Sequence, residues 1–318
     1  MSRVSVVIPN YNGIKFMDKC MKCLEAQNYK DFDVIVVDNA SEDGSQDIAL
    51  KYSDNLNVSV VRFTENLGFS AAVNEGIQKS RAEYVFLLNN DAYAGKHCIE
   101  ELVRKMDSDD RIFSAQALML QYRNKNLVDS AGDYFSAMGW AFSGGRDKHA
   151  DLYVQDRDVF SCCAGAAMYR KDAFEHIGLF DENFFAYLED VDIGYRAKLH
   201  GYRNVLAVRA KVLHVGSGAS GSRHNAFKVK LSVRNSFLVM YKNFATWQKV
   251  VNMPLVGIGV LIKTLFFAGK GLFKAYNEGL KEYRRMKKNV TRTRAVNSRI
   301  NRGIEVELFC NSFLRFIK

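Results

Sequence analysis

The sequence predicts an α/β fold in which a mostly parallel β-sheet is covered by helices on both faces and is followed by a basic helical extension. Apolar runs rich in valine and isoleucine recur at 4–8, 34–37, 58–61 and 84–88, separated by segments of helical character. Strands this uniformly apolar are expected where neither face of the sheet meets water. Positive charge gathers at the other end of the chain, because residues 240–318 hold 16 Lys and Arg against 4 Asp and Glu, whereas the rest holds 29 against 31.

The middle of the chain continues this alternation less regularly. A further strand is expected at 113–120, and the Gly-rich and aromatic stretch around Trp140, within residues 112–170, indicates an insert that shapes a substrate site. Helical character returns at 189–200. The remaining expected elements are a short strand at 205–208, a Gly/Ser loop at 214–222 and a long helix at 224–243.

Composition and cysteine usage are those of a folded intracellular protein. The 318 residues are 48% apolar and 25% charged, with only two prolines. The six cysteines form no regular framework, and Cys20 and Cys23 lack a second C-x2-C pair or a nearby histidine, which favours ordinary thiols over a zinc site. The first apolar run is too short for a signal peptide. We therefore expect a cytoplasmic protein.

Polar residues stand where three of the predicted strands end. They are Asn10, Tyr11 and Asn12 after the first strand, Asp38 at the end of the second, and Asn89, Asn90 and Asp91 after the fourth. Ligands of parallel sheets bind beyond the carboxyl ends of the strands, so we expect these side chains to border one binding site. The alternative is that Asn and Asp only form turns, which explains each group alone better than all three together.

The order and spacing of PNYNG, VVDNASEDGS, NLGFSAAVNEG and LLNNDA resemble those of the family 2 glycosyltransferases. The later segment GLFDENFFAYLEDVDIGYRAKLHGY, with His214 downstream, resembles the rhamnosyltransferase and galactofuranosyltransferase branch of that family. The resemblance covers roughly residues 3–240. It implies the A-type, Rossmann-like nucleotide-sugar fold, with a catalytic domain at 1–240 whose nucleotide-sugar half is 1–111 and whose acceptor half is 112–240.

The resemblance also implies a set of residues that bind the nucleotide-sugar. Asp38 would read the base or the ribose, since its carboxylate accepts hydrogen bonds. Gly68 would let the diphosphate approach the N-terminus of the helix that follows, a favourable place for an anion. The full set is Pro9, Asn10, Tyr11, Asn12, Asp38, Asn66, Gly68, Asn74, Asn89, Asn90 and Arg234. Local turns, a helix cap at Asp43 and solvated arginines are the structural alternatives.

LLNNDA occupies the place of the family's two-aspartate metal motif, but asparagines stand at its first two polar positions. Asp91 is therefore the expected metal ligand, and by resemblance His214 is the second. When one carboxylate binds a hard divalent cation, diphosphate and water can complete the coordination shell of that cation. We expect Mn²⁺ or Mg²⁺, and a histidine ligand favours Mn²⁺.

An acidic pair opens the helix predicted at 189–200. By resemblance Asp190 is the catalytic base, which takes the proton of the acceptor hydroxyl, and Glu189 orients the acceptor. Because acidic residues are also common in a first helical turn, capping is the alternative for Glu189, Asp190 and Asp192. A base acting in one in-line displacement predicts inversion at the anomeric carbon.

Residues 241–318 are expected to form a basic amphipathic helical region. Lys263, Lys270 and Lys274 interrupt the apolar run at 253–276 and fall on one helical face, which favours a helix lying in the membrane interface. A packed helical subdomain, an oligomer contact and a true span are the alternatives. The predicted partner is an anionic membrane surface, which places the protein at the inner face of the cell membrane.

Together these features predict an inverting glycosyltransferase that moves a rhamnose-like or other hexose from a dTDP- or UDP-sugar to a lipid-linked glycan acceptor in cell-surface polysaccharide synthesis. A sugar nucleotidyltransferase is one alternative, although it should carry a Gly-rich loop with Arg and Lys where this chain has PNYNGIKF. A non-catalytic nucleotide-binding or membrane scaffold is another, although it would be expected to lack Asp91 or Asp190. No nucleic-acid motif accompanies the basic tail, so no nucleic-acid partner is expected, while a homo-oligomer is compatible with the sequence.

Overall fold

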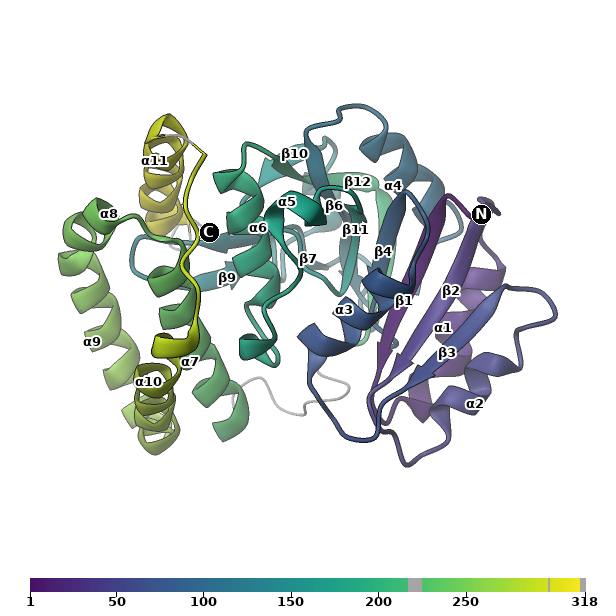
Figure 1. The fold of residues 1–318 in the computed structure, drawn as a ribbon, viewed down its shortest axis with the longest axis horizontal. Helices are drawn as coiled ribbons and strands as arrows, with labels where there is room; N and C mark the ends of the chain where they lie inside the picture. Colours follow the sequence, from purple (N-terminus) through teal and green to yellow (C-terminus); the bar gives the residue numbers. More distant parts are fainter. Residues whose placement is uncertain (217–224, 297, 315–318) are drawn as a thin grey trace.

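The computed structural model describes residues 1–216, 225–296 and 298–314. One mixed sheet runs through the molecule in the order β10-β12-β6-β11-β4-β1-β2-β3, with β5 paired to β12 and β7 paired to β6 (Figure 1). Its strands are β1 (Val4–Asn10), β2 (Phe32–Asp38), β3 (Val58–Arg62), β4 (Tyr84–Leu88), β5 (Ala92–Ala94), β6 (Ile112–Gln121), β7 (Val128–Ser130), β10 (Arg157–Val159), β11 (Ala166–Arg170) and β12 (Arg203–His214). A separate hairpin joins β8 (Asp133–Phe135) to β9 (Ala141–Ser143).

Strand direction decides which residues share an edge of the sheet. β1, β2, β3 and β4 are parallel to one another, β11 is reversed between β4 and β6, and β12 is parallel to β6. The carboxyl ends of β1, β2, β4 and β12 therefore lie at one edge, and they carry Asn10, Asp38, the segment 89–91 and His214. The mostly parallel α/β fold is confirmed, as are the strands predicted at 4–8, 34–37, 58–61, 84–88 and 113–120.

Helices cover both faces of the sheet because each presents an apolar stripe to it. On one face lie α1 (Ile14–Glu25), α2 (Ser45–Leu50) and α4 (Cys98–Met106), and on the other lie α3 (Phe69–Lys79), α5 (Phe174–Ile177) and α6 (Glu189–Leu199). Short 3₁₀ turns occur at Ala150–Leu152 and Glu182–Phe184. The helix predicted at 189–200 is thus confirmed as α6.

β12 is longer than the strand predicted at 205–208. It runs alongside β6 as far as His214, with a register shift between Ala207 and Lys211. Residues 208–212 alternate between buried and exposed positions, as a strand does, and pairing to β6 resumes at Lys211 after the shift. The Gly/Ser loop predicted at 214–222 lies outside the described residues from 217 onward.

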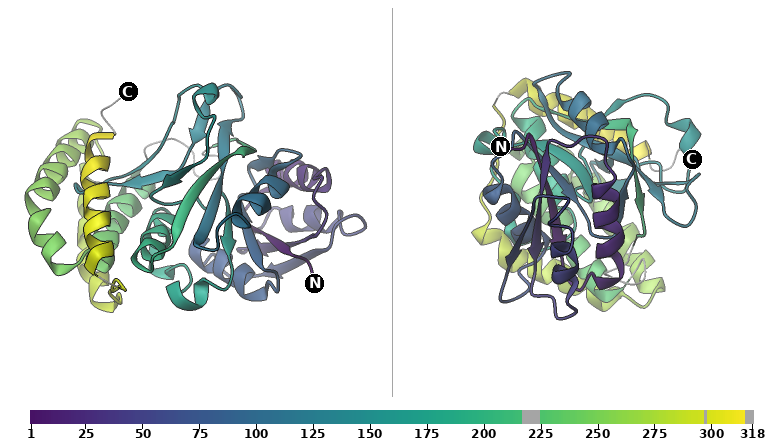
Figure 2. Two further views of the ribbon diagram at one scale, coloured as in Figure 1. Left: turned by 90° about the horizontal axis from the view of Figure 1, so that it is seen from above. Right: turned by 90° about the vertical axis from the view of Figure 1, so that its right-hand side faces the viewer.

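The C-terminal helices gather at the end of the molecule opposite β1–β3 (Figures 1 and 2). They are α7 (Ala226–Asn243), α8 (Thr246–Val251), α9 (Met253–Gly269), α10 (Phe273–Met286) and α11 (Ser298–Leu314), with a 3₁₀ turn at Lys287–Asn289. Ile304 and Leu308 of α11 are buried in one apolar cluster with Phe135, Phe160 and Tyr195. The tail therefore shares a core with the part of the chain that carries α6.

The segment predicted to be one amphipathic helix forms two, because the chain turns at Lys270–Leu272 between α9 and α10. Lys263 does not face outward, since its ammonium lies 5.5 Å from the centroid of the Trp140 ring. Gly259 allows this packing, because a Cβ there would lie 2.8 Å from the carbonyl oxygen of Met138. One apolar face of α9, which includes Leu261 and Leu265, consequently points away from the body of the protein, whereas Leu255, Val256 and Phe267 pack against it. None of the helices in the described ranges is long and apolar enough to cross a membrane.

Candidate active site

Side-chain amides tie together the ends of three strands. Asn10 donates from Nδ2 to Oδ1 of Asp38 at 2.8 Å, and its Oδ1 accepts from Nδ2 of Asn90 at 2.8 Å. A Cβ on Gly13 would lie 2.2 Å from Asn90 and 2.3 Å from Asn10, so only glycine fits beneath this network. The three predicted strand ends therefore meet as expected. The side-chain amide of Asn10, however, is hydrogen-bonded to other residues of the protein rather than open to a ligand.

The neighbouring loops complete this edge. Asp38 is buried and its Oδ2 also accepts from the amide N–H of Ser41. Asp43 accepts from the N–H groups of Ile14 and Ser45 at the starts of α1 and α2, which confirms its predicted capping role. Tyr11 and Asn12 are exposed, whereas Pro9 and Asn89 are partly buried. Tyr11 and Asn12 are thus the members of this group that are open to a ligand.

The N-terminus of α3, predicted to receive a diphosphate, is occupied by the chain itself. The N–H of Phe69 donates to the carbonyl oxygen of Phe185 at 2.6 Å, and a Cβ on Gly68 would lie 2.6 Å from that oxygen. Gly68 is needed for this close approach and for its φ of +90°. The exposed Asn66 accepts from the N–H of Gly68 and forms a local turn.

Two further predicted ligand contacts have structural roles instead. Asn74 donates to the carbonyl oxygen of Phe180 and accepts from its N–H, so it fastens α3 to the segment before α6. The guanidinium of Arg234 is buried and donates to the carbonyl oxygens of Asn183 and Phe184. Both side chains are buried and hydrogen-bonded within the protein, which favours a structural role over the predicted ligand contact.

Asp91 and His214 come together at the shared edge of the sheet. The Nε2 atom of His214 lies 3.3 Å from Oδ1 of Asp91, and its Nδ1 lies 2.7 Å from Oδ2 of Asp129. Burial alone lowers the pKa of His214, but the two carboxylates outweigh it and raise the pKa to about 9. Arg146 pairs with the other oxygen of Asp129 at 3.1 Å. A carboxylate behind a histidine is the usual arrangement at a metal centre.

Asp190 stands apart from the other acids in the first turn of α6. Asp192 is fully buried and pairs with Arg196 and Lys242, so it has a structural role. Asp190 is only partly buried. Its carboxylate accepts hydrogen bonds from the N–H of Val191 at 2.8 Å and from the N–H of Ala164 at 3.4 Å. In the described ranges no Lys or Arg lies within salt-bridge distance of it. Burial raises its pKa. These contacts orient a carboxylate without neutralising it.

Glu189 precedes this carboxylate at the end of a strained loop. Phe185, Tyr187 and Leu188 have φ angles of 61°, 70° and 66°, values that non-glycine residues adopt rarely. Glu189 is 6% exposed, and its Oε2 has no hydrogen-bond partner in the described part of the chain. Burial, followed by the charge of Asp190, raises the pKa of Glu189 well above its ordinary range.

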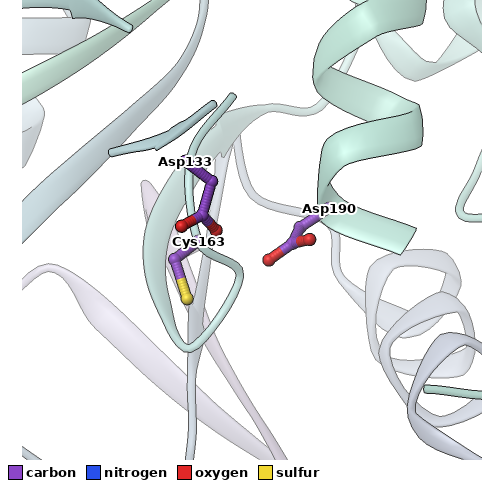
Figure 3. Close-up of side chains that lie close together, drawn as sticks. All are labelled: Asp133, Cys163 and Asp190. Atoms are coloured by element: carbon purple, nitrogen blue, oxygen red, sulfur yellow. The ribbon is translucent and has the colours of Figure 1, made fainter. Parts of the chain in front are cut away.

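A further group beside Asp190 was not predicted. One ligand atom each from Asp133, Cys163 and Asp190 lies within 4.8 Å of the others, and Asp190 reaches from α6 toward the other two (Figure 3). A group of this kind could hold a metal ion. Asp129 and Asp133 both come from the stretch 112–170, where the only sequence signal was a pair of acids in VDSAGD.

Known proteins share this arrangement of elements and motifs. The sequence profile of glycosyl transferase family 2 matches residues 5–178. The chain belongs to glycosyl transferase family 2. It is therefore a transferase enzyme, as the motifs predicted, and the alternatives of a nucleotidyltransferase and a non-catalytic scaffold are set aside.

Relatives of this glycosyltransferase extend the comparison. An uncharacterized glycosyltransferase of Rickettsia typhi is 28% identical over 61% of this chain, and the match spans 58% of that relative's length. An N-acetylglucosaminyl-diphospho-decaprenol L-rhamnosyltransferase of Mycobacterium tuberculosis is 22% identical over 76% of this chain and 85% of its own. The chain thus spans less than two thirds of the first relative.

Solved structures share the fold of this glycosyltransferase. GalNAc-T7, crystallised with UDP, GalNAc and Mn²⁺, has a TM-score of 0.62 at 17% identity. The match covers 92% of this chain and 55% of the GalNAc-T7 chain. S. aureus TarS residues 1–349, in complex with UDP-GlcNAc, has a TM-score of 0.61 at 16% identity. The match covers 99% of this chain and 88% of the TarS chain. The predicted A-type glycosyltransferase fold is confirmed.

Proposed function

We propose that this glycosyltransferase moves a rhamnose-like or other hexose, with inversion, from a dTDP- or UDP-sugar to a lipid-linked glycan acceptor in cell-surface polysaccharide synthesis. The observation that carries the proposal is the carboxylate of Asp190, which two main-chain N–H groups orient and which no cation within salt-bridge distance neutralises in the described ranges. The name of the mycobacterial relative supports a diphosphoprenol-linked acceptor. We also propose that residues 1–111 bind the donor, that 112–240 bind the acceptor, and that 241–318 associate with the membrane.

Asp190 acts as the base in this proposal. The proton of the acceptor hydroxyl passes to its carboxylate while that oxygen bonds to the anomeric carbon from the face opposite the nucleoside diphosphate. The bond to the diphosphate oxygen breaks in the same displacement, so the configuration inverts. Burial favours this chemistry, because a carboxylate whose pKa is raised holds the incoming proton more strongly. Glu189, with one carboxyl oxygen unpartnered, is placed to receive a hydroxyl of the acceptor.

Asp91 and His214 fit a divalent cation. Their facing atoms, Oδ1 and Nε2, lie 3.3 Å apart, and Asp129 fixes the far nitrogen of the imidazole. We assign Mn²⁺ or Mg²⁺ here rather than to the group around Cys163, because these hard cations prefer oxygen ligands to a thiol. When bound, the cation supplies positive charge to the leaving diphosphate. The Mn²⁺ in the GalNAc-T7 structure supports this choice of metal.

The donor's nucleotide belongs at the ends of β1 and β2 in this proposal. Asp38 is held in place by Asn10 and Ser41, and a carboxylate oxygen can still accept a further hydrogen bond from a base or a ribose. Tyr11 and Asn12 are exposed beside it. Asn89 and Asn90 connect this end to Asp91. In this proposal Asp38, Tyr11 and Asn12 touch the nucleotide, and Asn10 holds Asp38 in place.

The outward face of α8 and α9 is proposed to rest on an anionic membrane surface. Its exposed apolar side chains include Val250, Val251, Met253, Leu261 and Leu265, each at least 60% exposed. The surrounding tail carries the protein's excess of positive charge, because residues 240–318 hold 16 Lys and Arg against 4 Asp and Glu. Apolar insertion combined with attraction to anionic headgroups is how monotopic helices bind. A lipid-linked acceptor would then lie in the surface to which the enzyme is bound.

A donor screen tests the proposal. Purified enzyme is incubated with dTDP-rhamnose, UDP-GlcNAc, UDP-galactose or GDP-mannose and an N-acetylglucosaminyl diphosphoprenol acceptor, and release of the nucleoside diphosphate is measured. We expect turnover with a dTDP- or UDP-sugar, inversion seen by NMR of the product, and loss of transfer by at least about 100-fold in Asp190→Asn with donor affinity unchanged. Retention of configuration, or full activity in Asp190→Asn, would contradict the mechanism.

A further inference from the structure

Asp133 is held at a fixed position beside the proposed base. It begins β8, and its main chain exchanges two hydrogen bonds with Ser161, at 2.9 and 3.0 Å. The preceding Gly132 has a φ of +97°, and a Cβ there would lie 2.4 Å from Val159. No larger residue than glycine fits at 132, so the backbone that carries the Asp133 side chain has little freedom.

The carboxyl groups of Asp133 and Asp190 lie close together. One oxygen of each lies within 4.8 Å of the other and of the Cys163 sulfur (Figure 3). Two carboxylates this close cannot both ionise readily, and burial raises the pKa of both above the ordinary range. The main-chain N–H groups of Val191 and Ala164 donate to Asp190 and favour its ionised form, so we place the proton of the pair on Asp133.

The surroundings of the pair are acidic or neutral. The titratable groups near the pair come from several elements. They are Glu189 from α6, Asp129 from β7, Tyr134 from β8, Tyr169 from β11, and the thiols of Cys162 and Cys163. No Lys or Arg forms a salt bridge with Asp133 or Asp190 anywhere in the three described ranges. Without a cation, a hydrogen bond from a protonated neighbour is the remaining way to stabilise an ionised Asp190 apart from the main-chain N–H groups.

We propose that Asp133 is a positioning residue that donates a hydrogen bond to the carboxylate of Asp190 and keeps it ionised and oriented toward the acceptor hydroxyl. The inference rests on the proposed function of Asp190 as the base. Asp133 takes no proton from the acceptor. It sets the direction of the carboxylate and the pH at which that carboxylate becomes available.

An NMR titration tests this without any substrate. The enzyme is labelled with ¹³C at the aspartate carboxyl carbons, and Asp190→Asn assigns the Asp190 signal. We expect Asp133→Ala to raise the titration midpoint of Asp190 by about one pH unit, since a hydrogen bond to an ionised group is lost. Asp133→Asn should leave the midpoint near that of the wild type, because its amide can still donate. Unchanged midpoints in Asp133→Ala would overturn the proposal.

Kinetics provide the second readout. With the dTDP- or UDP-sugar that gives turnover in the donor screen, Asp133→Ala should move the acid limb of kcat to higher pH and lower kcat about tenfold at neutral pH, with the donor KM unchanged. Asp133→Asn should recover most of the rate, and Asp151→Asn, an exposed acid in the same stretch, should match the wild type. Equal losses in Asp133→Ala and Asp133→Asn without a shifted limb would overturn the positioning role.

The outcomes also separate this inference from the function it rests on. If Asp190→Asn transfers sugar normally, the base assignment fails and Asp133 has nothing to position. If Asp190→Asn is inactive while Asp133→Ala keeps the wild-type pH profile, only the inference about Asp133 fails. A cation retained by the wild type after dialysis, but lost from both Asp133→Ala and Cys163→Ser, would show that the group holds a metal and would also overturn the proposal.

Discussion

The imidazole of His214 bridges two carboxylates, with Nε2 3.3 Å from Asp91 and Nδ1 2.7 Å from Asp129. Asp91 follows β4, His214 ends β12, and Asp129 belongs to β7, so three separate strands converge on one ring. Fixing one nitrogen of a histidine orients the other. The predictions below begin with this triad.

Replacing Asp91 by asparagine should abolish the proposed metal site. Of the two ligands proposed from the described residues, Asp91 is the one that carries negative charge, so we expect Mn²⁺-dependent turnover to fall at least about 100-fold. EDTA should inhibit the wild type, and Mn²⁺ binding followed by electron paramagnetic resonance should be tight only when UDP or dTDP is present. The exposed Asp54→Asn is the matched control. Turnover that resists EDTA would rule out a metal mechanism.

Asp129→Asn should weaken the metal site without removing a ligand. Losing the carboxylate behind the imidazole should raise the Kd for Mn²⁺ by about 10- to 100-fold. Activity should recover at higher Mn²⁺ concentration, which distinguishes an orienting carboxylate from a ligand. If saturating Mn²⁺ does not restore turnover, Asp129 has another role.

Glu189→Gln should change the pH dependence of stability. In the unfolded chain the carboxyl ionises near its ordinary pKa, about 4.3, whereas burial raises the folded-state pKa well above this. Between the two values the folded state binds more protons than the unfolded state, so stability falls as pH rises. The glutamine variant should melt about 2–4 °C higher at pH 8 and nearly equal to the wild type at pH 4, as measured by calorimetry. A constant difference across this range would contradict the assignment.

Arg234→Met should destabilise the protein rather than weaken donor binding. The change leaves the carbonyl oxygen of Asn183 without its donor. It also removes one of two donors to the carbonyl oxygen of Phe184, where Asn235 remains, and one of two basic partners of Glu282, where Lys230 remains. We expect a loss of about 3 kcal/mol in the free energy of unfolding, with the donor KM unchanged. Arg302→Met, at an exposed position, is the control. A raised donor KM at unchanged stability would return Arg234 to the phosphate-binding set.

Membrane binding should depend on α9. Leu261 and Leu265 are 60% and 65% exposed, so Leu261→Glu combined with Leu265→Glu should lower binding to phosphatidylglycerol vesicles at least about tenfold and leave the fold intact. Point substitutions are preferable to removing the tail, because Ile304 and Leu308 belong to the core. Leu152→Glu, at an equally exposed apolar residue, should bind as the wild type does. Equal binding of the double variant would exclude this face.

The parallel half of the sheet was predictable because its strands are buried on both faces and read as uninterrupted apolar runs. The meeting of Asn10, Asp38 and Asn90 follows from the same rule, since carboxyl ends of parallel strands share an edge. β7, β8 and β9 are three residues long each and show no period, so they could not be predicted. Asp129 in β7 and Asp133 in β8 were missed for that reason.

The structure departs from the predictions at Asn74, Arg234 and the start of α3 for one reason. Each residue type suits a nucleotide ligand, but each here satisfies main-chain groups of the segment 177–188, which is distant in sequence. Composition cannot show whether a polar side chain is already bonded. By contrast, the family resemblance singled out Asp190 from the acids of this helix, and the salt bridges of Asp192 to Arg196 and Lys242 agree with that choice.

The carbonyl oxygen of Phe185 at the start of α3 has a consequence for turnover. A helix N-terminus is a permanent anion site, whereas a bound cation comes and goes with its ligand. The chain itself closes this terminus, because the Phe185 carbonyl accepts the N–H of Phe69. In the proposed mechanism, the nucleoside diphosphate product therefore has no helix terminus here to retain it, and we expect it to leave together with its cation.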